Sequence, residues 1–155
     1  MPIQPVQPTA KPLTGGCLCG GIRYEVDVIN GRIGHCHCTM CRRFHGAAYA
    51  TFGEASANSF RWTAGESLLQ AFKAENGTVR QFCRQCGSSL TFTSASNPAG
   101  IVEFAAATLD NESLGSRCDE LVPDAHIFVA DKAPWVNIDD GLPQYRAGRP
   151  SERLR

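Results

Sequence analysis

The chain has 155 residues, with 15 Lys and Arg balanced by 15 Asp and Glu, and it contains 8 Cys. A chain of this length favours a single domain with an ordinary buried core, and its zero net charge argues against broad electrostatic binding to nucleic acid or anionic lipid. No apolar run approaches the roughly 18 residues that a membrane-spanning helix needs. We therefore expect neither a nucleic-acid partner nor a membrane partner.

The N-terminal segment, residues 1–12, contains four prolines and no apolar periodicity, which is typical of a flexible extended arm. It has neither the basic start nor the apolar stretch of a secretory signal, so we expect a cytoplasmic protein. After this arm, the sequence predicts one domain over residues 13–148 and a C-terminal tail over residues 149–155.

Most of the remaining signals are those of short strands. Apolar and polar residues alternate over residues 22–28, and Asn76 with Gly77 predicts a hairpin that joins two neighbouring strands. The strand candidates after residue 28 are residues 47–52, 68–72, 78–82, 90–93, 101–106 and 126–129. The best helical candidate is a single turn over residues 39–45. The sequence therefore predicts a mainly β domain whose short strands carry cysteines at their ends and turns.

The cysteines fall into three clusters, and Cys118 stands alone. The clustered positions are Cys17 and Cys19, then Cys36, Cys38 and Cys41, then Cys83 and Cys86. Disulfide frameworks are typical of small secreted domains that lack a sufficient core. Cysteines one or two residues apart rarely bridge each other, but they can direct two ligands at one ion. The spacing therefore indicates metal binding rather than disulfides.

The first and third clusters have the form of glycine-closed metal-binding turns, here called knuckles. Gly20 follows Cys19 and Gly87 follows Cys86, and glycine readily adopts the positive φ that such a turn often requires. Two knuckles supply four thiolates, which suit a tetrahedral zinc ion at about 2.3 Å from each sulfur. We predict a structural Zn2+ site, because four ligands leave no open position. Its ligands are Cys17, Cys19, Cys83 and Cys86.

The middle cluster places three cysteines within six residues, at Cys36, Cys38 and Cys41. Three protein ligands and one open position are the pattern of catalytic zinc, so we predict a second, catalytic Zn2+ here. Two alternatives stay open: a histidine closes the site as a second inert zinc, or the cluster holds an iron–sulfur centre. The candidate histidines are His35, His37 and His126.

The ligand set also bears on the reaction. Three thiolates give a zinc site net negative charge, which makes the ion a weaker Lewis acid than zinc held by three histidines. A substrate thiol, bound as a nucleophilic thiolate beside an electrophilic carbon, therefore fits better than activated water. Arg42 and Arg43 follow the cluster directly. We interpret them as solvated neutralising charges, with reception of a substrate carboxylate as the alternative.

Three further residues are interpreted from their surroundings. His37 lies between two predicted ligands, so its side chain should point away from the metal. His126 begins an apolar strand and is expected to be a core histidine with satisfied hydrogen bonds, with a role in a pocket as the alternative. Cys118 lies in a polar stretch and is interpreted as a free thiol. The alternative is that Cys118 reaches the second site on a mobile loop as a fourth ligand.

Three motifs carry a resemblance over about residues 14–146. They are Gly16-Cys17-Leu18-Cys19-Gly20, Cys36-His37-Cys38-Thr39-Met40-Cys41-Arg42 and Phe82-Cys83-Arg84-Gln85-Cys86-Gly87-Ser88. Together they resemble the glutathione-dependent formaldehyde-activating enzyme family, also called the GFA/centromere protein V family. The stretch over residues 126–143 is similar to the end of that domain.

The resemblance implies an Mss4-like fold of several small antiparallel sheets built around zinc knuckles. It implies the same two zinc sites, one structural with four cysteines and one catalytic with three cysteines and an open position. The family's named activity is reversible condensation of formaldehyde with glutathione, a carbon–sulfur lyase reaction. We therefore predict a zinc-dependent lyase that joins glutathione to formaldehyde or a similar small aldehyde. The rival is a protein-binding module in which both zincs are structural, and a homodimer stays open.

Overall fold

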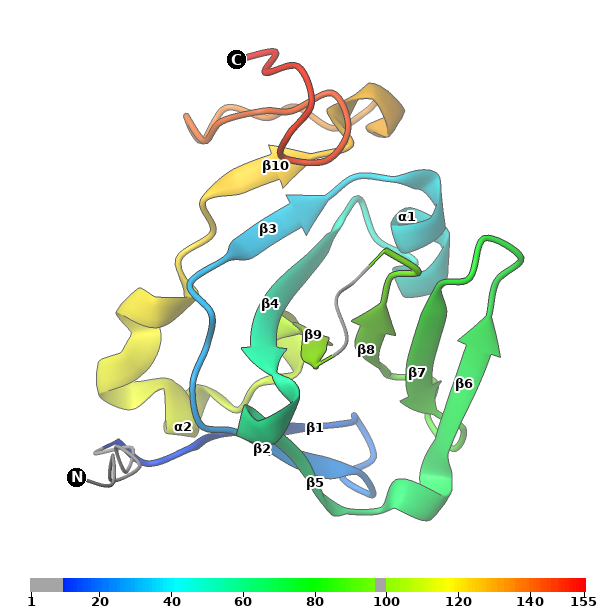
Figure 1. Cartoon of the computed structure of the whole chain (residues 1–155), viewed down its shortest axis with the longest axis vertical. Coiled ribbons are helices and arrows are strands. Elements are labelled where there is room, and N and C mark those ends of the chain that lie inside the picture. The colour runs from blue at the N-terminus through cyan, green and yellow to red at the C-terminus, as the bar shows by residue number, and fades with distance from the viewer. Residues whose placement is uncertain (1–9, 97–99) are drawn as a thin grey trace, which may run out of the picture.

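The computed structural model describes residues 10–96 and 100–155, so most of the predicted N-terminal arm lies outside the described residues. The described chain forms two sheets (Figure 1), which confirms the mainly β class. The three-stranded sheet has the order β1 (Leu13–Gly16), β2 (Arg23–Val26), β5 (Phe60–Ala64). The seven-stranded sheet has the order β10 (Ala125–Ile127), β3 (Ile33–Cys36), β4 (Ala50–Ser56), β9 (Ile101–Ala105), β8 (Ser89–Thr93), β7 (Val79–Cys83), β6 (Leu69–Lys73).

Helices are short and lie in the connections. The α-helices are α1 (Thr39–His45) and α2 (Asn111–Leu114). The 3-10 turns are η1 (Ala57–Ser59), η2 (Glu66–Leu68), η3 (Ala106–Thr108), η4 (Gly115–Leu121) and η5 (Val129–Asp131). Within the described part of the chain, no helix is long and apolar enough to cross a membrane.

The hairpin and the helical turn predicted from sequence are both confirmed. Strands β6 and β7 pair antiparallel, and the turn between them closes where the Asn76 side chain accepts the Thr78 N–H at 3.1 Å. Helix α1 occupies residues 39–45, as the sequence predicts. The pairing of β10 with β3 differs from the expected antiparallel pattern because these two strands run parallel. Parallel partners need a long connection, and most of the chain separates these two.

The main core lies between the two sheets and draws residues from both. Tyr24 on β2 and Phe104 on β9 are fully buried, and Tyr24 stacks on Phe60 with ring centroids 5.1 Å apart. Cys17 and Cys83 belong to the same core cluster. The hydrophobic packing therefore brings the first and third cysteine clusters together.

A close backbone approach beside the first knuckle requires glycine at position 65. A Cβ on Gly65 would lie 1.9 Å from the Gly21 carbonyl oxygen, and its φ is +75°. Gly31 has a similar φ of +79° but no atom within 4 Å of the corresponding position. We expect Gly31→Ala to cost about 1 kcal/mol of unfolding free energy through φ alone. Gly65→Ala should lower the unfolding free energy by about 1–3 kcal/mol more than Gly31→Ala does, because the added Cβ overpacks the contact with Gly21.

Chemical denaturation of the two alanine variants, at matched metal content, measures this difference. Gly31→Ala is the matched control because it changes the same residue type at nearly the same backbone angle. Equal losses in the two variants would contradict the close contact between Gly65 and Gly21.

At the other end of the molecule, the C-terminal segment folds back beside β10 (Figure 1). The Leu154 N–H donates to the Gln144 carbonyl at 2.7 Å, and the Arg149 guanidinium donates to the Asp124 carboxylate at 2.6 Å. These contacts hold residues 149–155, the predicted tail, against the domain.

Candidate metal centres

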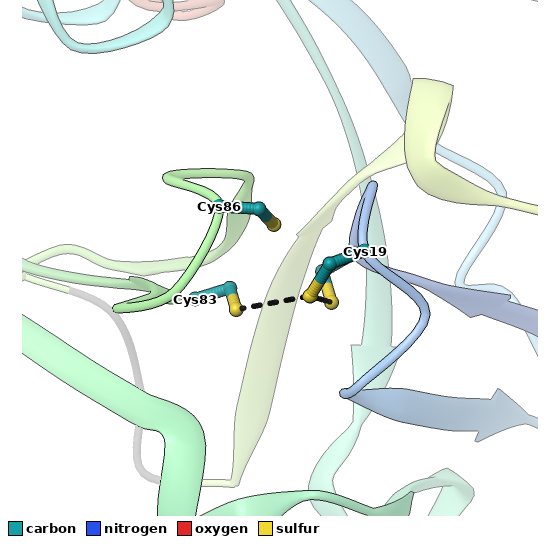
Figure 2. Close-up of side chains that lie close together, drawn as sticks. Cys19, Cys83 and Cys86 are labelled. Carbon is teal, nitrogen blue, oxygen red and sulfur yellow. Dashed lines mark hydrogen bonds between the residues drawn. The ribbon is translucent and has the colours of Figure 1, made fainter.

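The four-cysteine cluster joins the turn after β1 to the turn after β7. The four sulfurs of the cluster all lie within 4.8 Å of one another. They belong to Cys17, Cys19, Cys83 and Cys86. The Cys17 and Cys19 sulfurs are 3.4 Å apart, and the Cys19 and Cys83 sulfurs are 3.9 Å apart. Four sulfurs about 2.3 Å from a tetrahedral ion would be about 3.8 Å apart. Figure 2 shows Cys19, Cys83 and Cys86 converging from the two turns, so the cluster fits zinc.

The knuckles form as their sequences predict. Gly20 and Gly87 have φ values of 75° and 80°, and the Ile22 N–H donates to the Cys17 sulfur at 3.2 Å. Ser88 links the two knuckles: its hydroxyl accepts the Leu18 N–H at 2.8 Å and lies 3.3 Å from the Cys86 sulfur. Hydrogen bonding from Ser88 lowers the pKa of Cys86 to about 5. A thiolate is the form that a metal binds.

The three-cysteine cluster is built by the end of β3 and the start of α1. Cys36 ends the strand, Cys38 is the N-cap residue of α1, and Cys41 lies in its first turn. Their sulfurs lie within 4.8 Å of one another, and the Cys41 N–H donates to the Cys38 sulfur at 3.3 Å. Hydrogen bonds from Cys36 and Cys41 lower the pKa of Cys38, while hydrogen bonding to Cys38 raises the pKa of Cys36. Cys38 is therefore prepared as a thiolate ligand.

Arg80 is a functional candidate that sequence reasoning missed. Its side chain is buried, and both of its terminal nitrogens lie 3.7 Å from the Cys41 sulfur. The guanidinium also lies over the rings of Phe44 and Phe92, at 5.4 Å and 4.6 Å from their centroids. This fixed positive charge offsets the negative charge of a three-thiolate metal site. No local sequence signal distinguishes Arg80 from the other arginines, since its role depends on a contact 39 residues away.

The three cysteines open onto a cavity of about 470 Å³. Its apolar wall includes Phe52, Phe92 and Ile127. The arginines that line it are Arg32, Arg80 and Arg149. Arg42, considered as a carboxylate receptor, instead donates to the backbone carbonyl of Asp131. The cavity therefore presents cations that lie outside the cysteine motif, two of them, Arg80 and Arg149, far from it in sequence.

Two carboxyl groups share the cavity wall. Glu54 on β4 pairs directly with Glu103 on β9, and both residues line the cavity. Burial and the neighbouring charge of Glu54 raise the pKa of Glu103 to about 7, while Arg80 acts in the opposite direction. A carboxyl group with this pKa can both give and accept a proton near neutral pH.

The histidines near the second cluster lie outside it. His37 is fully buried, and its Nε2 lies 2.8 Å from Nδ1 of His126. His126 Nε2 in turn lies 2.8 Å from the Asp140 carboxylate. His126 is thus the buried, hydrogen-bonded histidine that the sequence predicts. His35 and His126 group with Asp140, and no histidine of the described residues joins the three-cysteine cluster.

The remaining cysteine, Cys118, is exposed, and its thiol donates to the Gly115 carbonyl at 2.9 Å. It belongs to neither cysteine cluster among the described residues. All eight cysteines lie in the described ranges, and each is a free thiol there, so no disulfide joins them. The 8 Cys therefore divide into four, three and one, as their spacing predicts.

The fold and the two clusters define a class of small β protein whose turns carry cysteine clusters that could hold metal ions, with one cluster open to a cavity. Within that class, the chain belongs to the glutathione-dependent formaldehyde-activating enzyme family, GFA, whose family model matches residues 12–131. Membership implies the Mss4-like fold that the sequence motifs suggested.

Two relatives support this assignment. The chain is 24% identical over 129 residues to an uncharacterized lyase of Schizosaccharomyces pombe, covering 81% of this chain and 91% of the relative. It also resembles the crystal structure of a Rhodobacter sphaeroides protein at 29% identity and a TM-score of 0.54, covering 66% of this chain and 94% of that one.

Proposed function

We propose that the protein is a zinc-dependent carbon–sulfur lyase that reversibly joins the thiol of glutathione to formaldehyde or a similar small aldehyde. The observation that carries this proposal is the three-cysteine cluster on the wall of a cavity. Membership of the GFA family supports glutathione and formaldehyde as the substrate types, and the relative named as a lyase supports the reaction class. None of the eight cysteines, all of which lie in the described ranges, forms a disulfide, which fits a protein of the reducing cytoplasm.

The donor chemistry of both clusters fits zinc. Four soft sulfur ligands make a closed site, while Cys36, Cys38 and Cys41 leave one position for a substrate atom. The chemistry that a zinc ion supplies there is stabilisation of the substrate sulfur as a thiolate. Arg80, bonded to the Cys41 sulfur, limits the negative charge that collects around this position.

The cavity residues supply binding and proton transfer. Arg32 and Arg149 line the cavity and suit the carboxylates of glutathione. Glu103 takes the thiol proton as the sulfur becomes a nucleophile. The sulfur lone pair then forms the C–S bond, the C=O π pair moves to oxygen, and Glu103 returns the proton to that oxygen. The product is the S-hydroxymethyl adduct, a hemithioacetal, and the same steps in reverse release the aldehyde.

Glu103→Gln is expected to lower turnover by about 10²–10⁴-fold, because it removes the proton carrier and keeps the side-chain volume. The wild-type rate should show a pH limb near the Glu103 pKa of about 7, and this limb should vanish in the variant. Steady-state rates measured across pH test both points. Glu112→Gln, an exposed change on α2, is the matched control. A variant with the wild-type pH profile would exclude Glu103 from proton transfer.

Zinc-edge X-ray absorption with and without glutathione tests the proposed function on protein holding two zinc ions. We expect one zinc with four sulfurs and a second zinc with three sulfurs and an exchangeable ligand. That ligand should become sulfur when glutathione is added. Two closed four-ligand sites that do not respond to glutathione would contradict the enzyme and favour the zinc-stabilised binding module. NMR that monitors formation of the S-hydroxymethyl adduct completes the test.

A further inference from the structure

Two histidines lie on the face of β3 opposite the cavity. The parallel pairing of β10 with β3 sets His126 beside His35 and Ile127 beside Cys36. Side chains alternate across a strand, and Cys36 and Ile127 line the cavity. His35 and His126 therefore share the other face, with their ring centroids 4.8 Å apart.

A carboxylate reaches the same place from the segment after β10. The Asp140 side chain is exposed, and its Oδ2 lies 2.8 Å from His126 Nε2. One ligand atom from each of His35, His126 and Asp140 lies within 4.8 Å of the other two. Three segments of the chain thus bring a half-buried imidazole, a buried imidazole and an exposed carboxylate together.

Each imidazole has one nitrogen held by a neighbouring side chain. His35 Nδ1 lies 2.8 Å from the Thr51 hydroxyl, and His126 Nδ1 lies 2.8 Å from His37 Nε2. The other ring nitrogen of each histidine is its Nε2, and that of His126 faces the Asp140 carboxylate. Histidines that bind a metal are characteristically held in this way, with the second nitrogen bonded to a fixed partner that orients the ring.

We propose that His35, His126 and Asp140 bind a divalent transition-metal ion as a third metal site, separate from both cysteine clusters. Two imidazoles and one carboxylate suit zinc or cobalt and leave a position for water. The ion would replace the hydrogen bond between His126 and Asp140. It would tie β3, β10 and the segment carrying Asp140 together, on the reverse side of the strand that presents Cys36.

Cobalt added to full-length protein whose cysteine clusters hold two zinc ions tests the site. Equilibrium dialysis with elemental analysis counts the bound ions, and absorption spectra report the ligands, because thiolate-bound cobalt shows sulfur charge-transfer bands that a nitrogen and oxygen site lacks. We expect one further cobalt ion per chain, without those bands. Asp140→Asn should weaken its binding at least tenfold, while Asp139→Asn, an exposed neighbouring change, should not.

Thr51→Val provides an independent variant because it keeps all three ligands and removes only the partner of His35. We expect it to weaken the third ion by about 10–100-fold. Zinc content and thermal unfolding of each variant confirm that the cysteine clusters and the fold are intact. Wild-type protein that binds no third ion, cobalt that appears with sulfur bands, or equal binding by Asp140→Asn and Asp139→Asn would overturn the proposal. The three side chains would then be a hydrogen-bond network only.

Discussion

Replacing Cys38 by serine is expected to abolish turnover while leaving the domain folded. The serine hydroxyl can still accept the Cys41 N–H that the Cys38 sulfur accepts, and serine is a preferred N-cap residue, so α1 should persist. The change removes the sulfur whose pKa is lowered by hydrogen bonds from Cys36 and Cys41, and with it one of three ligands. We expect bound zinc to fall by one ion per chain and turnover to fall by more than about 100-fold, since even losing an outer partner of a ligand costs 10–100-fold.

Cys118→Ser is the matched control for this experiment. It makes the same chemical change at an exposed cysteine outside both clusters, so zinc content and turnover should both be retained. Elemental analysis and an NMR assay of thiol and formaldehyde consumption provide the two measurements. Wild-type turnover in the Cys38→Ser variant would exclude this metal as the catalyst. Loss of zinc in Cys118→Ser would instead show that Cys118 is a ligand.

Replacing Cys83 by serine is expected to have the larger effect on stability. Cys83 is fully buried in the main core, and its cluster joins two turns more than sixty residues apart. Zinc binding to structural sites releases about 10–16 kcal/mol in small zinc peptides, whereas a whole domain is stable by about 5–15 kcal/mol. We therefore expect the Cys83→Ser variant to be largely unfolded at room temperature.

Circular dichroism and thermal unfolding measure this effect, again with Cys118→Ser as the matched control. Removing zinc from the wild type with a strong chelator should produce the same loss of structure. A Cys83→Ser variant that unfolds within a few degrees of the wild type would contradict a structural role for the four-cysteine cluster.

The contrast between Cys38→Ser and Cys83→Ser separates the enzyme from the binding module. If one site is catalytic and the other structural, the first variant is folded and inactive and the second is unfolded. If both sites are structural, both variants lose stability and the wild type itself does not turn over substrate. Unfolding and turnover measured together on the same samples therefore distinguish the two interpretations.

Local features of this protein could be predicted from sequence because their geometry is set within a few residues. Cysteines two or three positions apart share one turn, so Cys36, Cys38 and Cys41 can meet at one point whatever surrounds them. The same holds for the positive φ of the glycine that closes each knuckle and for the hairpin at Asn76 and Gly77. Turn chemistry of this kind depends on the backbone, which the residue types specify directly.

The partners of these local features depended on the tertiary structure. Arg80 reaches the Cys41 sulfur because β7 and α1 pack together. The pKa of Glu103 is raised because the fold buries its carboxyl group and the strand register places it against Glu54. His35 and His126 become neighbours through a parallel pairing that the sequence pattern did not predict. The local sequence around an arginine, a glutamate or a histidine does not reveal its role, because its partners and its pKa depend on residues distant in sequence that packing brings close. The sequence by itself determined which sulfurs can hold metal, and the fold decided which charges surround them.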